Sequence, residues 1–322
     1  MRTLLFAAAT LIIAVACEST TDKSTLTLPG LDAKGNTPSL FAPGLVSTQH
    51  SQRDLAIAPD SSELFYTQVA PNSVYSALVR WYRDEAGQWQ GPQIAPFSGR
   101  WRDLEPAYSP DGQWLYFASN RPVAGDSAKD FDLWRVPKTT QGWGEPENLG
   151  ATVNGPGNEF YPSIAANGNL YFTAQREDAV GLEDIYRSTY ADGAWAPAVP
   201  LDTGVNSAGY EFNAYVAPDE SYLLFSGYRR PDGFGGGDLY VSLRGEGGVF
   251  GPARNLGAEI NTPGLDYCPF VWQHTLYYTS TRSLLATSPD SALNWEALTE
   301  VLDGPENGNS SLFRVLWKPA RE

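Results

Sequence analysis

The residues best suited to chemistry are acids and arginines that recur at a nearly constant spacing. Four acids lie 52 to 56 residues apart, a glutamine stands one repeat before them, and four arginines follow the same spacing. The positions are Gln52, Asp103, Glu159, Glu211 and Asp266, and Arg121, Arg176, Arg229 and Arg282. If these side chains line a common channel, they can bind a sugar, a peptide terminus or a cation. They can also form ion pairs with one another. The recurrence favours ion pairs, within a repeat or with Asp132, Asp184 or Asp238, because a residue that every repeat requires usually serves the structure.

Paired carboxylates are the one enzymatic option. Glycoside hydrolysis needs two acids about 5 to 10 Å apart, one of them protonated. The recurring acids are symmetric, whereas a specialised site normally breaks the repeat. We therefore expect binding rather than catalysis, and an acid/base pair would involve positions that do not recur: Gln52, Asp178, Glu183, Asp290 and Glu296.

Other catalytic and metal-binding patterns are missing from the sequence. His50 and His274 are the only histidines and have no metal-ligand spacing, so we expect no metal and no other cofactor. The glycine-rich residues 233–238 lack a following Lys-Ser/Thr and predict a turn rather than a phosphate site. Cys268 begins an apolar segment and is expected to be a small buried residue, not a nucleophile.

An internal repeat predicts the elements that position these residues. Residues 106–121 read PAYSPDGQWLYFASNR, 162–176 read PSIAANGNLYFTAQR, and 214–229 read AYVAPDESYLLFSGYR; shorter copies lie at 56–67 and 269–282. Each copy predicts a strand, a tight turn and a second strand. DLWRV, DIYRS and DLYVS, with the segments after them, predict a third and a fourth strand. Four-stranded antiparallel units at this period are typical of β-propeller blades.

The SPDG…LYF…SNR…DLW pattern resembles the WD40-like (Pro-Asp type) repeat of TolB-like propellers. The resemblance covers residues 40–322 and implies an all-β propeller. It implies little about function, because proteins with this repeat include binding modules and peptidase propellers.

Five blades account for the repeat. Residues 305–315 match the third-strand segment at 231–241, so the chain ends on the third strand of its last blade. The fourth strand of that blade should come from residues 40–46, which would close the ring. Residues 283–308 then form an enlarged loop in blade five, with Trp295 as a further binding candidate; packing against the blade is favoured over binding. The alternative counts residues 284–301 as strands of blade five and makes the last strand part of a sixth blade.

The net charge of −15 argues against nucleic acid as a partner, because phosphates would be repelled. It also disfavours electrostatic adhesion to anionic lipid.

The N-terminus resembles the signal peptide and lipobox of bacterial lipoproteins. A basic start, an apolar run from Leu4 to Val15 and the small residue Ala16 precede Cys17. The resemblance implies cleavage after residue 16, acylation of Cys17 and a polar flexible tether over residues 17–39. Glu18, in place of the Asp associated with inner-membrane retention, favours the outer membrane.

The sequence thus predicts a monomeric, periplasm-facing lipoprotein of the cell envelope that touches the membrane only through its lipid. Its propeller is expected to bind an envelope protein, a peptide or a glycan without catalysis. The alternative is a carbohydrate-active enzyme with paired carboxylates near the channel.

Overall fold

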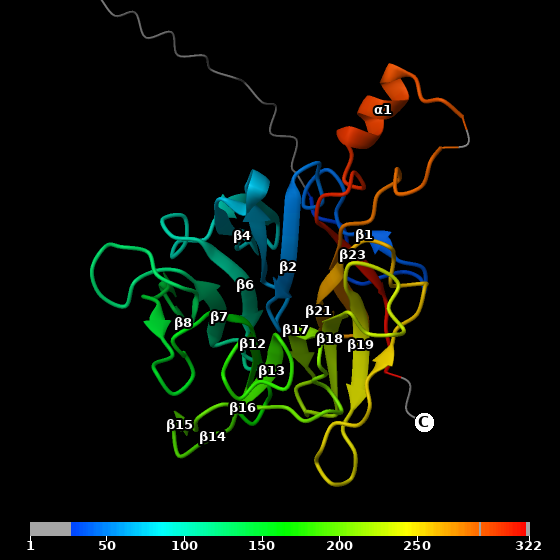
Figure 1. The fold of residues 1–322 in the computed structure, drawn as a ribbon. Coiled ribbons are helices and arrows are strands. Elements are labelled where there is room, and N and C mark those ends of the chain that lie inside the picture. Colours follow the sequence, from blue (N-terminus) through cyan, green and yellow to red (C-terminus); the bar gives the residue numbers. More distant parts are fainter. Residues whose placement is uncertain (1–26, 290, 320–322) are drawn as a thin grey trace, which may run out of the picture.

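A computed structural model describes residues 27–289 and 291–319 and shows a five-bladed β-propeller (Figure 1). The predicted fold class is therefore confirmed, with five blades rather than six. The predicted leader, Cys17 and the first part of the predicted tether lie outside the described residues.

Each blade is an antiparallel sheet whose first strand lies nearest the axis. The first blade contains β2 (Ser51–Ile57), β3 (Glu63–Val69), β4 (Ser76–Arg83) and β5 (Trp89–Ile94), with a 3-10 turn η1 (Pro71–Ser73). The second contains β6 (Asp103–Tyr108), β7 (Trp114–Ser119), β8 (Asp132–Thr139) and β10 (Glu147–Asn148), with β9 (Gly142–Trp143) paired to β8. The third contains β11 (Glu159–Ile164), β12 (Leu170–Ala174), β13 (Asp184–Ser188) and β16 (Val199–Pro200), and carries the hairpin β14 (Tyr190–Ala191) and β15 (Ala194–Trp195).

The fourth blade contains β17 (Tyr210–Val216), β18 (Tyr222–Tyr228), β19 (Asp238–Leu243) and β20 (Arg254–Asn255). The fifth contains β21 (Asp266–Trp272), β22 (Thr275–Ser280), β23 (Ser311–Leu316) and, from the N-terminal side of the chain, β1 (Ser39–Leu40).

The second strand of each blade is buried on both sides, which explains its continuous apolar sequence. All five residues of β12 and all six of β22 are buried. The turns that lead into these strands are fixed by side chains. Asp60, Asp111 and Asp219 each accept a hydrogen bond from the backbone N–H two residues later, at 2.9 to 3.0 Å. These contacts explain why Pro-Asp recurs at this point of the repeat.

Two distant parts of the chain close the ring. β1 pairs with β23 in the register Ser39↔Arg314 and Leu40↔Phe313, and Phe41 N–H extends the pairing to Leu312 O at 2.8 Å. The closing strand has two residues rather than the seven expected, because Ala42 takes a left-handed φ of 47° and turns the chain away.

The residues before β1 also contact blade five. Leu28, Leu31 and Ala33 are buried, and Ala33 N–H donates to Thr275 Oγ1 at 2.9 Å. The sequence did not indicate these contacts, because the segment contains few apolar residues.

The loop between β22 and β23 forms an arm that carries α1 (Trp295–Leu302). The side chain of Asn294 caps the helix by accepting the N–H of Ala297 at 2.8 Å. No α1 residue is buried, Trp295 is 76% exposed, and Figure 1 shows the helix standing away from the sheets. This arrangement differs from the packing against the blade that the sequence favoured. Within the described ranges no helix is long and apolar enough to cross a membrane.

Candidate ligand-binding site at the propeller axis

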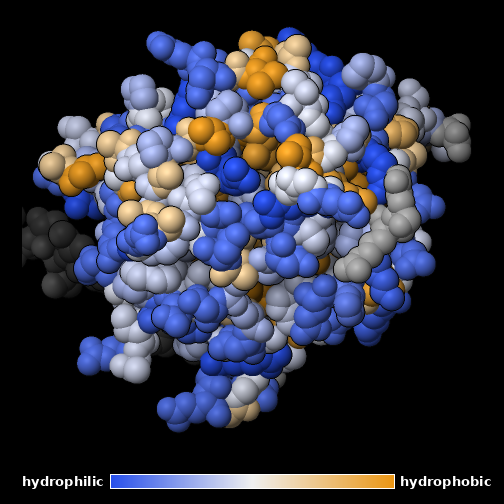
Figure 2. Space-filling model, turned by 90° about the horizontal axis from the view of Figure 1, so that it is seen from below, coloured by the Kyte–Doolittle hydropathy of each residue, from blue (hydrophilic) through white to orange (hydrophobic). Residues whose placement is uncertain are grey.

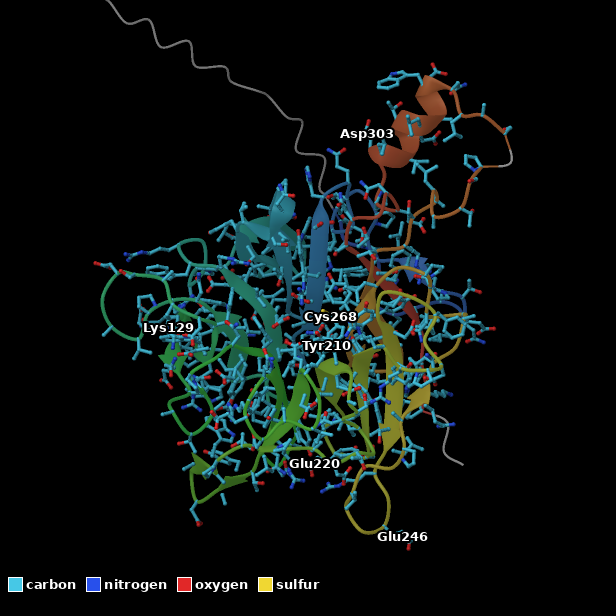
Figure 3. The ribbon with its side chains drawn as sticks, in the orientation of Figure 1. Lys129, Tyr210, Glu220, Glu246, Cys268 and Asp303 are labelled. Atoms are coloured by element: carbon cyan, nitrogen blue, oxygen red, sulfur yellow. The ribbon has the colours of Figure 1, made fainter. Side chains whose placement is uncertain are left out.

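The two ends of the propeller axis differ in structure. The first strands β2, β6, β11, β17 and β21 begin on the side where α1 stands, here called the arm face (Figure 1). They end at the turns to the second strands, on the opposite side, here called the turn face. Figure 3 shows Asp303 on the arm, Cys268 in the middle of the propeller and Glu220 at the turn face.

The five recurring positions at the start of the first strands are all buried, with exposed fractions of 1% or less: Gln52, Asp103, Glu159, Glu211 and Asp266. Their side chains fix the connectors between blades. Gln52, Glu159, Glu211 and Asp266 each accept the N–H of the residue four positions earlier, at 2.6 to 3.0 Å. Asp103 instead accepts the hydroxyl groups of Ser98 and Ser119, at 2.7 and 2.6 Å.

Arginines two residues beyond the ends of the second strands complete these contacts. Arg121 Nη2 lies 2.8 Å from Asp103, and Arg176 Nη2 lies 2.9 Å from Glu159. Arg282 is more distant, at 3.5 Å from Asp266. The same guanidinium groups donate to connector carbonyls, for example Arg121 to Phe97 O at 3.0 Å. The acid and the arginine of one blade therefore hold the connector that precedes that blade.

Arg229 does not take the place that the repeat spacing predicted. Its backbone is left-handed (φ 64°), and its guanidinium lies over the rings of Tyr210 and Tyr228. Arg230 instead contacts Glu211, with Nε at 3.0 Å. One extra residue at the end of β18 causes this shift, and counting along the repeat could not reveal it.

These acids and arginines thus have structural partners, which agrees with the favoured ion-pair interpretation. Their proposed role in ligand binding remains a prediction. Trp295, the tenth candidate, lies on the arm and not among them.

A second ring, deeper in the channel, comes from a β-bulge in the first strand of every blade. The pairing between first and second strands shifts register at the same point in all five blades. The residue at each shift is left-handed, with φ between 52° and 61°, and all five are buried: Asp54, Glu105, Tyr161, Asn213 and Cys268. A bulge reorients one side chain locally, and here the five chemically different residues meet at the axis. We call them the bulge ring.

The backbone of the bulge ring is held by the preceding blade. The N–H groups of Asp54, Glu105 and Asn213 donate to the hydroxyls of Thr279, Thr67 and Thr173, at 3.0 to 3.3 Å. In the second blade the equivalent of these threonines is Ala118, which has no hydroxyl to accept the bulge N–H of the third blade. There the carboxylate of Glu105 accepts Tyr161 N–H instead, at 2.7 Å. Glu105 therefore replaces the missing hydroxyl and couples two blades.

Arg53, the residue before Asp54, is the cation that contacts the bulge ring. Its guanidinium donates to Asp54 at 2.7 Å, to Glu105 at 2.6 Å and to Cys268 Sγ at 3.3 Å. Asn213 Nδ2 adds a bond to Glu105 at 3.2 Å. Tyr161 crosses the channel and donates its hydroxyl to Pro269 O at 3.0 Å. The ring is thus a continuous hydrogen-bonded plug across the axis.

Burial controls the protonation of the plug. Desolvation raises the pKa of Glu105 to about 8, although Arg53 favours its ionised form. Desolvation also raises the pKa of the Cys268 thiol. The prediction that Cys268 is a buried, unreactive residue is confirmed as to burial, since its exposed fraction is 1%.

The plug separates two hollows on the axis. On the arm side, a pocket of about 310 Å³ has Arg53, Glu105 and Asn213 in its floor. Its walls are mainly apolar and comprise Leu104, Phe131, Phe160, Phe212, Leu265 and Tyr267, with Arg102, Thr173 and Glu183 as further polar groups. On the turn side, a pocket of about 340 Å³ is lined by Ile57, Val216, Phe270, Trp272 and their neighbours. Figure 2, a view of the turn face, shows apolar residues gathered in its upper part among hydrophilic ones.

One polar side chain of the arm-side pocket has unused bonding capacity, and an acid lies beside it in the same lining. Arg102 lies over the ring of Phe131 at 5.1 Å, and its buried Nε has no hydrogen-bond partner among the described residues. Burial raises the pKa of Glu183. A donor and an acid beside aromatic walls form a polar and apolar surface that a ligand can satisfy.

None of the residues that line this pocket is one of the recurring acids and arginines. The bulge ring lies two residues after the recurring acid position, where the sequence has a different residue in every repeat. A position whose residue type differs in every repeat carries no repeat signal in the sequence. Glu183, one of the acids that do not recur, lies in the pocket wall. Among the described residues no group of histidine, cysteine, aspartate or glutamate is arranged to hold a metal ion.

Comparison with known proteins supports the fold. No protein-family model and no curated protein matches the sequence. A complex of BT0996 with RGII matches with a TM-score of 0.54 and 10% identity, over 91% of this protein and 92% of that one. A glycoside hydrolase matches with a TM-score of 0.51 and 10% identity, over 91% of this protein and 93% of that one. TolB from Acinetobacter baumannii matches with 0.44 and 12%, over 84% of this protein, which spans 55% of TolB. At these identities the likeness concerns the propeller fold alone.

Proposed function

We propose that this propeller is a non-catalytic binding protein of the cell envelope, and that its arm-side pocket takes the end of a peptide or glycan chain. The observation that carries the proposal is the plug. Because the bulge ring closes the axis, the pocket is blind and suits a chain terminus better than a threaded segment. The proposed localisation rests on the leader and Cys17. A lipid on Cys17 would attach the propeller to a membrane.

The pocket offers a specific recognition chemistry. The unpaired Nε of Arg102 can donate to a carboxylate, such as a peptide C-terminus or a uronate. Phe131, Phe160 and Phe212 supply apolar surface for the group next to that carboxylate. The orphan donor also gives specificity, since a ligand without an acceptor would leave it unsatisfied.

The carbohydrate-active alternative depends on Glu105 and Glu183, two acids of one pocket. A pKa of about 8 would keep Glu105 protonated at neutral pH, as a general acid requires. The fold likeness to a glycoside hydrolase is compatible with this alternative. Against it, both oxygens of Glu105 already accept bonds from Arg53, Asn213 and Tyr161 N–H, so this acid serves the plug. The binding function is therefore better supported.

The test is a thermal-shift and calorimetric screen of defined carboxylate probes. Tripeptides to pentapeptides with free or amidated C-termini would be compared with uronate and neutral oligosaccharides. At least one free-carboxylate probe should bind, and Arg102→Gln should abolish that binding. Arg100→Gln is the matched control, because Arg100 is 68% exposed in its side chain and its one ion pair among the described residues is with the exposed Asp126.

Binding that survives Arg102→Gln, or a lack of any carboxylate ligand, would contradict the proposal. Mass spectrometry of the oligosaccharide probe after incubation with the protein tests the carbohydrate-active alternative, because it detects cleavage. Cleavage that disappears in Glu105→Gln would show an enzyme.

A further inference from the structure

A cleft between the second and third blades is separate from the axis. It opens beside the turns of the turn face and has a volume of about 400 Å³. Its walls come from the turn after β6, from β7 and β8, from the turn after β11 and from the β14–β15 hairpin. The aromatic residues that line it are Trp114, Tyr116, Tyr190 and Trp195.

The last residue of the first strand distinguishes this cleft from the groove between the first and second blades. In the equivalent groove between the first and second blades, Tyr108 packs on Phe65 and Trp143, with ring centroids 6.0 and 6.1 Å apart. Trp195 is the repeat equivalent of Trp143, but the position of Tyr108 is held by Ile164, as it is by Ile57, Val216 and Val271 in the other three blades. The smaller side chain leaves the space of an aromatic ring unfilled.

The cleft walls are held in place without a ligand. Trp195 Nε1 donates to Gly168 O at 3.1 Å, and Tyr190 N–H donates to Asn169 Oδ1 at 3.0 Å. The two rings of the hairpin lie 5.3 Å apart. Arg135 lies 4.0 Å from the ring centroid of Trp114 and 5.4 Å from that of Trp195. A site built in this way loses little entropy when it binds a ligand.

The chemistry of the lining suits a saccharide. Sugar rings present C–H groups on their faces, which pack on the electron-rich faces of aromatic rings, and hydroxyl groups at their edges. Asp111 and Arg135 supply an acceptor and a donor beside the aromatic walls. A phosphate ligand fits less well, because Arg135 already pairs with Glu147 at 3.0 Å and Asp111 adds negative charge. We propose that this cleft is a saccharide-binding site, independent of the arm-side pocket.

The test uses a glycan array with the fluorescently labelled protein, followed by calorimetry with the strongest neutral or acidic glycan. Ile164→Tyr should abolish binding while leaving the Tm equal or higher, because it adds the ring that Tyr108 supplies in the neighbouring groove. Tyr190→Ala should weaken binding about tenfold or more, as loss of a stacking platform does. Tyr228→Ala is the matched control, since Tyr228 is 38% exposed and Tyr190 is 37% exposed.

Three outcomes would overturn the inference. They are an array without any bound glycan, glycan binding that Ile164→Tyr leaves intact, and equal losses for the two tyrosine variants. Binding that Arg102→Gln removes and Ile164→Tyr spares would place the glycan in the arm-side pocket, so the two proposals fail separately.

Discussion

Replacement of Arg53 by methionine should show that the plug depends on one buried cation. Arg53 contacts Asp54 at 2.7 Å and Glu105 at 2.6 Å, and these carboxylates are 0% and 3% exposed in their side chains. Removal of one partner from a buried ion pair costs about 3–5 kcal/mol, because the other charge remains buried. At pH 7 that remaining charge is the carboxylate of Asp54, since a pKa of about 8 keeps Glu105 mostly protonated. Arg53 itself is 22% exposed in its side chain, so we expect a loss of about 3 kcal/mol in the free energy of unfolding at pH 7.

The pH dependence adds a second, independent expectation. The pKa of Glu105 is about 8 in the folded protein and about 4.5 when unfolded, so the folded state binds more protons between these values. The contribution of Glu105 to stability is therefore full below pH 4.5 and is lost as the pH rises to 8. Above pH 8 the native carboxylate meets Arg53, whereas in the variant it meets no cation. The cost of Arg53→Met should thus grow above pH 8, by about 1 kcal/mol per pH unit.

Urea denaturation at pH 6, 7, 8 and 9, followed by tryptophan fluorescence, measures both effects. Arg80→Met is the control: Arg80 is 21% exposed in its side chain and pairs with buried Glu63, but Lys138 also contacts Glu63 at 2.8 Å. That carboxylate keeps a cation, so Arg80→Met should cost about 1 kcal/mol at every pH. Equal losses for the two variants, or a loss for Arg53→Met that is the same at pH 7 and pH 9, would refute the reasoning.

Three further predictions concern the lipid anchor, the closure of the ring by β1 and the ion pair between Glu159 and Arg176. Cys17→Ser should move the protein from the membrane fraction to the soluble fraction and abolish labelling by radioactive palmitate; persistent labelling would contradict the anchor. Removal of residues 1–26 should leave the Tm unchanged, whereas removal of residues 1–47 should lower it strongly, because β1 and the buried residues before it are lost; equal Tm values would count against closure by β1. Glu159→Gln and Arg176→Gln should each destabilise the fold, with a coupling of about 0.5 to 3 kcal/mol in urea; stabilisation by either change would show that the recurring ring serves binding rather than structure.

The blades were predictable because their sequence signals are local and repeated. The Pro-Asp turns and the apolar second strands follow from side-chain contacts within about ten residues, such as Asp111 with Gln113 N–H. Closure by β1 was predictable from an incomplete last repeat. Its length was not, because it depends on the left-handed Ala42.

The chemistry at the axis was harder to foresee. The bulges result from the backbone pairing of first and second strands, and Tyr161 or Cys268 carries no sign of a left-handed conformation in its residue type. The position of Arg230 depends on one extra residue in β18. The helix of the arm was missed, although the Asn294 cap lies in the sequence immediately before Trp295.

The bulge ring also bears on how such a protein can change over evolutionary time. Each blade presents one residue to the axis from the same left-handed backbone position, and that position accepts an acid, an amide, a phenol and a thiol in a single protein. Substitution there alters the chemistry of the axis without altering the repeat that specifies the blades. Five positions can therefore diversify one at a time, and descendants of one scaffold can acquire different ligands while their sheets stay the same.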